Sequence, residues 1–187
     1  MPTTLTLTDF QQAAARLRTG VAEIKAVTEV ESNGRGFDSV GRIIIRFEPH
    51  KFHEYTKGKY DGTHPSLSFP QRRKNYPVDL NQSWDLYNIA KTLDLTATRL
   101  ATSFGMFQIM GSNFPSCGCK TVGEFVTKMC KSEAVQLDLF CRLLLDWRLD
   151  DELRNHQWAT FAKFYNGAGF RQLHYDTKLQ NAYAKHL

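Results

Sequence analysis

The stretch VAEIKAVTEVES, residues 21–32, decides the architecture that we expect for the chain. Its apolar residues recur at steps of three, at Val21, Ile24, Val27 and Val30. This spacing is typical of a helix that buries one face. The next four residues, NGRG at 33–36, contain two glycines and predict that the helix ends at about Glu31.

Two carboxylates, Glu29 and Glu31, close this predicted helix. Because they are two residues apart, they lie about 200° from each other around the helix axis and cannot both face one site. Glu31 lies near the edge of the buried face, whereas Glu29 points toward solvent. Partial burial and the negative end of the helix dipole both raise the pKa of a carboxyl group, which suits a general acid. Taken alone, the pattern is more typical of a solvated carboxylate, because perturbed catalytic carboxylates are rare.

Two later segments combine apolar and polar residues in a similar way. In SFGMFQIM, residues 103–110, a core segment explains the hydrophobes but not Gln108, whose amide needs partners once it is buried. A polar sugar would supply those partners. FYNGAG, residues 164–169, is typical of a helix end with a left-handed glycine. The alternative is that Tyr165 and Asn166 contact a substrate.

The order of these segments resembles the lysozyme superfamily, in particular its lytic transglycosylase and goose-type branches. Those proteins carry Glu-Ser at the end of a buried helix, then Gly-apolar-apolar-Gln-Ile, then Tyr-Asn-Gly. The chain has these motifs at 31–32, 105–109 and 165–167.

The bacteriophage endolysin family of N-acetylmuramidases is more similar still. Its members show Glu-Val-Glu-Ser followed by Gly-x-Gly-Phe, as at 29–37, and Phe-Glu-x-His-x-Phe, as at 47–52. With further matches at 103–105, 165–167 and 175–176, the resemblance runs from about residue 10 to 185. Phe104 departs from it, since many relatives have Trp there.

The resemblance implies cleavage of the β-1,4 bond between N-acetylmuramic acid and N-acetylglucosamine in peptidoglycan. Glu31 is the expected general acid, and Glu29 is the runner-up. Glu48 is the first candidate for a second acidic group, although a structural carboxylate bonded to loop backbone also explains it. Without a second carboxylate the enzyme would be a lytic transglycosylase, in which the 6-hydroxyl of the substrate attacks and leaves an anhydro sugar. A third alternative is a wall-binding protein that keeps the fold without catalysis.

Four more residues are expected to bind the glycan and to position its acetamido group: Ser103, Gln108, Tyr165 and Asn166. We expect no metal or other cofactor, since this chemistry needs none. His50 and His53 could share one face of a helix, but no third ligand is evident, so a zinc peptidase is disfavoured.

The rest of the chain predicts a mostly α (α+β), lysozyme-like domain with several helices and one small β-hairpin or sheet. Residues 1–8 alternate Thr and Leu and predict an extended N-terminal arm, followed by a helix capped by Asp9. RIIIRF, residues 42–47, is the best strand candidate, and 48–82 is expected to be a long ordered loop. Residues 100–110 are expected to be buried, as an irregular or helical segment. Further helices are expected at 84–95 after Ser83, 121–130 from Thr121, 132–148 from Ser132, and 150–165 as the last one.

Length and charge limit the organisation and the partners. The chain has 187 residues, so we expect residues 1–187 to form a single catalytic domain without a separate wall-binding domain. A net charge of +5 favours anionic partners, such as peptidoglycan and the anionic cell envelope. No zinc-finger or RNA-binding signature supports nucleic-acid binding. We expect a monomer.

No apolar run approaches the roughly 18 residues of a membrane span, and no secretory signal is readable at the start. We therefore expect no stable membrane insertion. The expected location is the host bacterial cytoplasm, and the resemblance implies that a holin-like pore gives access to the wall.

Four cysteines occur, at 117, 119, 130 and 141. Cys117 and Cys119 form a C-x-C pair rather than the C-x-x-C of common zinc sites. Without a secretory signal, reduced thiols are favoured. Cys130 and Cys141 fall in apolar helical patterns and are expected to pack as small hydrophobes.

Overall fold

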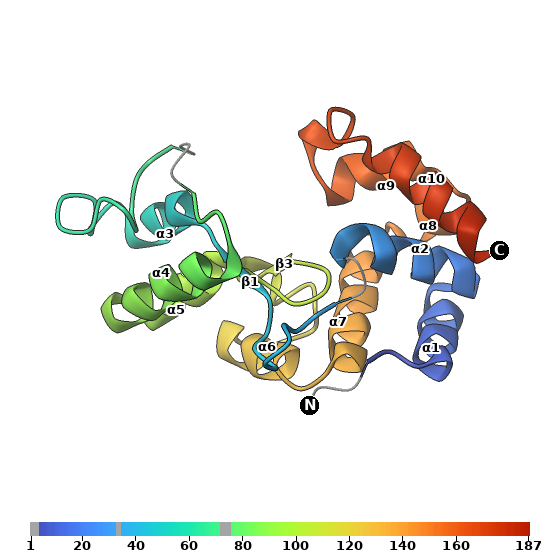
Figure 1. Cartoon of the computed structure of the whole chain (residues 1–187), viewed down its shortest axis with the longest axis horizontal. Helices are drawn as coiled ribbons and strands as arrows, with labels where there is room; N and C mark the ends of the chain where they lie inside the picture. Colours follow the sequence, from blue (N-terminus) through green and yellow to red (C-terminus); the bar gives the residue numbers. More distant parts are fainter. Residues whose placement is uncertain (1–3, 33–34, 72–75) are drawn as a thin grey trace.

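A small antiparallel sheet connects two groups of helices (Figure 1). The structure, a computed structural model, describes residues 4–32, 35–71 and 76–187. Its helices are α1 (Leu7–Leu17), α2 (Val21–Ser32), α3 (Pro49–Thr56), α4 (Leu80–Leu93), α5 (Leu95–Leu100), α6 (Val122–Met129), α7 (Glu133–Asp146), α8 (Asp150–Arg154), α9 (Trp158–Tyr165) and α10 (Tyr175–His186). The strands are β1 (Ile45–Phe47), β2 (Thr102–Phe104) and β3 (Ile109–Met110). The predicted mostly α fold with one small sheet is confirmed. Within these ranges no helix is long and apolar enough to cross a membrane.

The sheet has the order β1-β2-β3 and corrects two predictions. Residues 42–47 contribute only the three residues of β1, which pair with β2 from Ile45 opposite Phe104 to Phe47 opposite Thr102. The 100–110 segment contains the β2–β3 hairpin and is not helical. Its turn uses left-handed backbone at Gly105 (φ 71°) and Gln108 (φ 47°), which a helix would not allow.

The N-terminal helix begins earlier than predicted. Thr6 is its N-cap: its hydroxyl accepts from the Asp9 backbone N–H, while the Asp9 carboxylate accepts from the Thr6 N–H at 2.7 Å. This capping box satisfies exposed N–H groups and starts the helix at Leu7. The predicted arm over 1–8 is therefore wrong at residues 7 and 8, and its residues 1–3 lie outside the described ranges.

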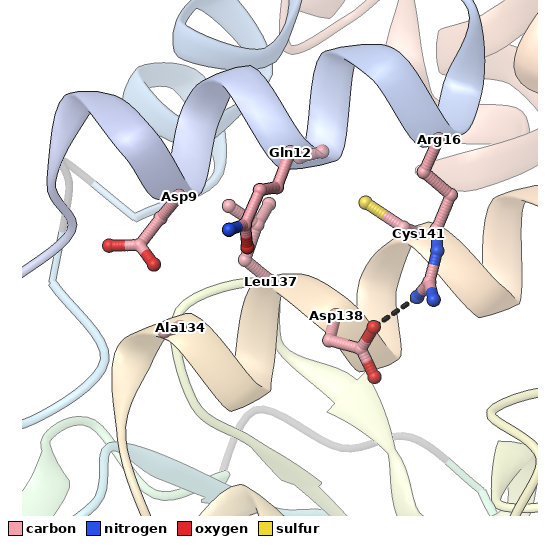
Figure 2. A pocket seen from close by; sticks show the side chains of 8 residues that line it. Asp9, Gln12, Arg16, Ala134, Leu137, Asp138 and Cys141 are labelled. Carbon is pink, nitrogen blue, oxygen red and sulfur yellow. Dashed lines mark hydrogen bonds and ion pairs between the residues drawn. The ribbon is translucent and has the colours of Figure 1, made fainter.

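Helix α1 packs on α7, as Figure 2 shows at close range. Ala13 and Leu17 are buried there. Arg16 of α1 forms an ion pair with Asp138 of α7 beside a cavity of about 200 Å³. The pair is exposed, so most of the stabilisation comes from the apolar contacts.

The predicted loop over 48–82 contains helix α3 and the start of α4. Pro49 opens α3, because a proline at the first helical position loses no hydrogen bond. Asp79, not Ser83, caps α4: its side chain accepts from the Gln82 N–H at 2.8 Å. Ser83 lies buried inside the helix.

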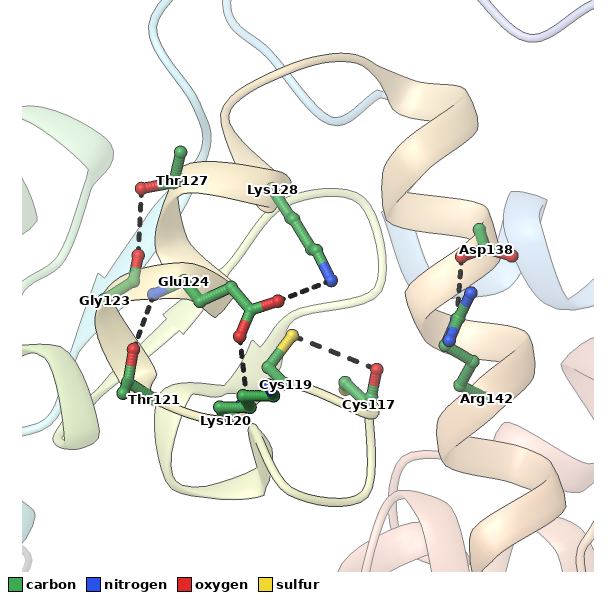
Figure 3. Close-up of polar contacts among 10 residues, drawn as sticks. All are labelled: Cys117, Cys119, Lys120, Thr121, Gly123, Glu124, Thr127, Lys128, Asp138 and Arg142. Atoms are coloured by element: carbon green, nitrogen blue, oxygen red, sulfur yellow. Dashed lines mark hydrogen bonds and ion pairs between the residues drawn. The ribbon is translucent and has the colours of Figure 1, made fainter.

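The caps predicted for α6 and α7 are confirmed. Thr121 accepts from the Glu124 N–H at 3.0 Å, as Figure 3 shows. Ser132 accepts from the Val135 N–H. Glu124 does not complete the expected capping box, because its carboxylate accepts from the Lys120 N–H at 2.7 Å.

The predicted last helix over 150–165 is two helices, α8 and α9, and α10 follows them. His156 separates α8 from α9 with a left-handed backbone (φ 54°). Its Nε2 lies 2.7 Å from a carboxylate oxygen of Glu23 in α2, and its ring stacks on Trp158. These contacts hold a conformation that interrupts the helix.

Helix α7 is the centre of the core and bonds to the segments around it. Gln136 is fully buried, with its Oε1 accepting from the Met106 N–H at 2.7 Å and its Nε2 donating to the Met129 carbonyl at 2.9 Å. Glu133 accepts from the Gly36 N–H at 2.8 Å. Leaving one such buried group unpaired costs roughly 1–3 kcal/mol, so these bonds fix the neighbouring loops on α7.

Three of the four cysteines are buried, and all four are free thiols. Burial raises the pKa of Cys117 and of Cys141 to about 12, which keeps both thiols protonated and unreactive. Figure 3 shows Cys117 and Cys119 beside α6. Cys130 is exposed, contrary to the prediction, because it follows the last turn of α6.

Candidate active site

A cleft of about 330 Å³ lies where the end of α2 meets the sheet, the end of α7 and the C-terminal helices. All six residues predicted for the site line it: Glu31, Glu48, Ser103, Gln108, Tyr165 and Asn166. They come from segments up to 135 residues apart, which the fold brings together.

Glu31 projects from the last turn of α2 into the cleft. It is half-buried, and burial raises its pKa from the ordinary 4.5 to about 7. The Asn166 Nδ2 donates to its Oε1 at 2.9 Å and acts in the opposite direction, since it stabilises the charged form. The carboxyl group is therefore partly protonated at neutral pH, which is the state that a general acid needs.

Glu29 lies outside the cleft, on the side of α2 that faces α10. Lys185 donates to both of its carboxylate oxygens, at 2.9 and 3.0 Å, and the His186 Nε2 lies 2.8 Å from Oε2. The hydrogen bond from Lys185 is the main cause that lowers the pKa of Glu29. Its position and its charge both argue against the runner-up role as general acid.

Glu48 follows β1 and precedes α3, and its side chain is 14% exposed. The Arg46 Nε lies 3.2 Å from Oε1, and the His50 Nδ1 lies 3.7 Å from Oε2. These ion-pair partners are side chains, rather than the loop backbone that the structural alternative predicted. The second carboxyl group of the cleft is therefore held by a side chain of β1 and a side chain of α3.

Ser103 and Gln108 form a small network within the hairpin. The Ser103 hydroxyl donates to the Gln108 Oε1 at 2.9 Å, and the Gln108 Nε2 donates to the Gly105 carbonyl at 2.8 Å. The premise that Gln108 needs a sugar to satisfy its amide is therefore wrong. Both side chains nevertheless line the cleft.

Tyr165 and Asn166 end helix α9 beside Glu31. The Tyr165 hydroxyl donates to the Phe107 carbonyl at 2.8 Å, and burial raises its pKa well above the ordinary value. Its ring packs edge-on against Phe140 of α7. The Asn166 Oδ1 is buried and has no hydrogen-bond partner among the described residues.

His50 and His53, considered above as a metal pair, have different partners. His50 contacts the hydroxyl of Tyr76, and the His53 Nδ1 lies 2.8 Å from the Asp61 carboxylate. In the described part of the chain, no group of three or more His, Cys, Asp or Glu side chains is placed to hold a metal ion.

Other residues also line the cleft without having been predicted for the site, among them Arg46, Trp147 and Tyr175. A charged residue within the apolar RIIIRF run was a usable signal for Arg46. Tyr175 lies in a motif of the resemblance, but no role was assigned to it. Trp147 had no local signal.

A half-buried carboxyl group in a polar cleft, on a mostly helical fold with a small antiparallel sheet, is typical of lysozyme-like glycoside hydrolases. Residues 20–187 match the N-acetylmuramidase family, and the chain belongs to this family. It is a glycoside hydrolase that acts on peptidoglycan.

One solved structure supports the same assignment. The crystal structure of Burkholderia AP3 phage endolysin is 35% identical to the chain and superposes with a TM-score of 0.89, covering 100% of this chain and 72% of that one. No curated protein matches the chain significantly.

Proposed function

We propose that the chain is a bacteriophage endolysin that cleaves the β-1,4 bond after N-acetylmuramic acid, with Glu31 as the general acid. The observation that carries the proposal is the half-buried Glu31, with a pKa of about 7, in a cleft with five other polar side chains of the expected site. The similarity to a phage endolysin supports the biological role.

In this mechanism, the Glu31 carboxyl group gives its proton to the glycosidic oxygen while the bond from that oxygen to the anomeric carbon breaks. Asn166 holds the carboxyl group through its hydrogen bond to Oε1. Glu48, held by Arg46 and His50, would stabilise the positive charge that develops on the sugar or accept a proton from the attacking water.

The transglycosylase alternative is favoured by one observation: both oxygens of Glu48 already have side-chain partners, Arg46 and His50. If these pairs persist with substrate bound, Glu48 is less available to activate water. The 6-hydroxyl of the substrate would then attack the anomeric carbon and give an anhydro sugar. Mass spectrometry of released muropeptides separates the two reactions, since hydrolysis gives reducing ends and transglycosylation gives anhydro ends.

Four side chains would bind the glycan: Ser103, Gln108, Tyr165 and Asn166. Ser103 and Gln108 are fixed by each other, and Tyr165 is fixed by its bond to Phe107, so the polar wall is preorganised. This rigidity supports a role in holding the acetamido group in one orientation.

The role as a phage endolysin also supports proposals about the domain organisation, the oligomeric state and the route to the cell wall. We propose one catalytic domain over residues 1–187 that acts as a monomer and reaches the wall from the host cytoplasm through a holin-like pore. The positive charge would add affinity for the anionic envelope.

A turbidity assay on permeabilised bacteria tests the proposed function. The chain should clear the suspension, and Glu31→Gln should not, although it folds as the parent does. Full clearing by Glu31→Gln would contradict the assignment of the acid. Binding to the wall without any release of muropeptides by the parent chain would indicate a non-catalytic wall-binding protein.

A further inference from the structure

A second cavity adjoins the cleft and shares Trp147 with it. This cavity has a volume of about 470 Å³ and is lined by Trp147, Arg148, Leu149, Glu152 and Phe164. We call the surface formed by Trp147 and Phe164 the aromatic shelf. Trp147 ends α7 and lies in the walls of both cavities, so the shelf begins where the cleft ends.

The two rings of the aromatic shelf are exposed to solvent, whereas most aromatic rings of the described residues are buried. Phe164 is 59% exposed and Trp147 is 36% exposed, and they are the aromatic members among the large exposed hydrophobic residues of the described ranges. A single exposed apolar residue needs no explanation. Two exposed aromatic rings that line one cavity beside a catalytic cleft are a different case, because solvating them costs free energy without a gain in packing.

The shelf is also held in place. The Trp147 ring lies 6.3 Å from the ring of Tyr165, whose hydroxyl is bonded to the Phe107 carbonyl. Leu149, which lines the same cavity, is 3% exposed. Arg148 and Glu152 add polar groups to the cavity, and the Lys163 Nζ lies 5.7 Å from the centre of the Phe164 ring. Apolar ring faces with polar groups at their edge match a sugar, which has apolar C–H faces and hydroxyl edges.

The occupant follows from the length of the substrate. A cleft of about 330 Å³ is small for a polymer, so a glycan strand must continue past it. The shelf is a neighbouring surface of suitable chemistry that is continuous with the cleft. Resting on the function proposed above, we propose that the aromatic shelf is a second saccharide-binding surface, which holds a sugar of the same strand beyond those in the cleft.

The kinetic test compares long and short substrates. Phe164→Ala should lower the ratio of kcat/KM on long glycan strands to kcat/KM on a short oligosaccharide by about 3- to 10-fold. This change corresponds to roughly 0.6–1.4 kcal/mol, which is the size of one aromatic contact. Leu173→Ala is the matched control, because Leu173 is 56% exposed and lines neither cavity. It should leave the ratio at the parental value. A ratio within about twofold of the parent for Phe164→Ala would overturn the proposal.

A binding test separates this proposal from the proposed function. In the Glu31→Gln background, adding Phe164→Ala should weaken co-sedimentation with purified peptidoglycan, and adding Leu173→Ala should not. If the parent chain cleaves no peptidoglycan but its binding still depends on Phe164, the proposed function is refuted and the saccharide-binding role of the aromatic shelf stands. If the parent chain cleaves peptidoglycan and Phe164→Ala leaves the ratio of the two kcat/KM values unchanged, the proposed function stands and the role of the aromatic shelf is refuted.

A third measurement addresses the other occupant that an apolar surface can have. If the shelf instead joins two copies, the parent chain would form a dimer at micromolar concentration in size-exclusion chromatography with light scattering, and Phe164→Ala would be monomeric. That result would overturn the saccharide proposal. A monomer in both cases supports it.

Discussion

The last turn of α2 carries two carboxylates with opposite surroundings. Glu31 faces the cleft, where burial raises its pKa to about 7. Glu29, two residues earlier, faces α10, where the hydrogen bond from Lys185 is the main cause that lowers its pKa. Both groups share one helix end, so the helix dipole cannot account for the difference.

The contrast between the two carboxylates shows that their surroundings are made by distant parts of the chain. Asn166, 135 residues away, contacts Glu31, while Lys185, 156 residues away, holds Glu29. The α2 sequence supplies the carboxyl groups and their angular separation. The C-terminal part of the chain supplies a different partner to each carboxyl group.

The largest expected effect concerns activity. Glu31→Gln should reduce kcat by about 10²- to 10⁴-fold, because a positioned general acid contributes roughly that factor. Glu29→Gln is the matched control and should stay within about threefold of the parent, since this carboxylate is outside the cleft and only its partly exposed ion pair is lost. Equal losses in both variants, measured on purified peptidoglycan, would remove the distinction between the two sides of α2.

The next effect is on stability and has opposite signs for the two groups. The folded-state pKa of Glu31 is raised above 4.5, so its favourable contribution is complete below about pH 4.5 and is lost as the pH rises through 7. Glu31→Gln removes this loss, and should be more stable than the parent by about 2–3 kcal/mol at pH 8 but not at pH 4. Urea unfolding at both pH values measures the difference.

Glu29→Gln should behave in the reverse way in the same unfolding experiment. Because the pKa of Glu29 is lowered in the folded state, its charged form stabilises the fold at pH values above the pKa of the unfolded state. That contribution is lost as the pH falls. The variant should therefore be less stable than the parent at neutral pH and equal to it in acid. The same sign for both variants would contradict the assigned surroundings.

A smaller effect is expected at Asn166. Asn166→Ala removes the donor that favours the charged form of Glu31, so the pKa of Glu31 should rise further. The basic limb of the pH profile of kcat/KM should move to higher pH. Activity should fall at least roughly tenfold, since a hydrogen bond to a charged group contributes about 1.5 kcal/mol or more. Asn155→Ala, at an exposed position after α8, is the control and should move neither. A limb that stays in place would exclude Asn166 as a partner of the acid.

The smallest expected effect is on stability and concerns the ion pair between Lys185 of α10 and Glu29 of α2. Lys185→Ala breaks a partly exposed ion pair and should cost roughly 0.2–1 kcal/mol of stability, less in high salt. Muramidase activity should stay at the parental level. A large loss of activity, measured with an unchanged melting temperature, would mean that the Glu29 side does influence the cleft.

Much of the site was predictable because its residues are marked locally. Glu31 lies at the end of a helix whose apolar residues recur at steps of three. Thr121 and Ser132 are N-caps, and their hydroxyls bond to backbone N–H groups three residues away. The resemblance then connected Glu31 with Tyr165 and Asn166. Their placement in one cleft supports that connection.

The misses come from interactions between residues far apart in the chain. The break between α8 and α9 depends on His156, whose partner Glu23 is 133 residues away. The hairpin at 102–110 depends on pairing with β1, and its residues alone look like a core segment. Trp147 enters the cleft only because α7 ends there, which periodicity cannot locate.

The bonds from α7 determine how substrate can enter. The hairpin side of the cleft is attached to α7 through Met106, and the segment after α2 is attached through Gly36, both by buried hydrogen bonds. Moving the hairpin or the segment around Gly36 away from α7 would break these buried hydrogen bonds. The hairpin wall of the cleft is therefore anchored to α7, and we expect a glycan strand to bind against it without a large displacement of the hairpin.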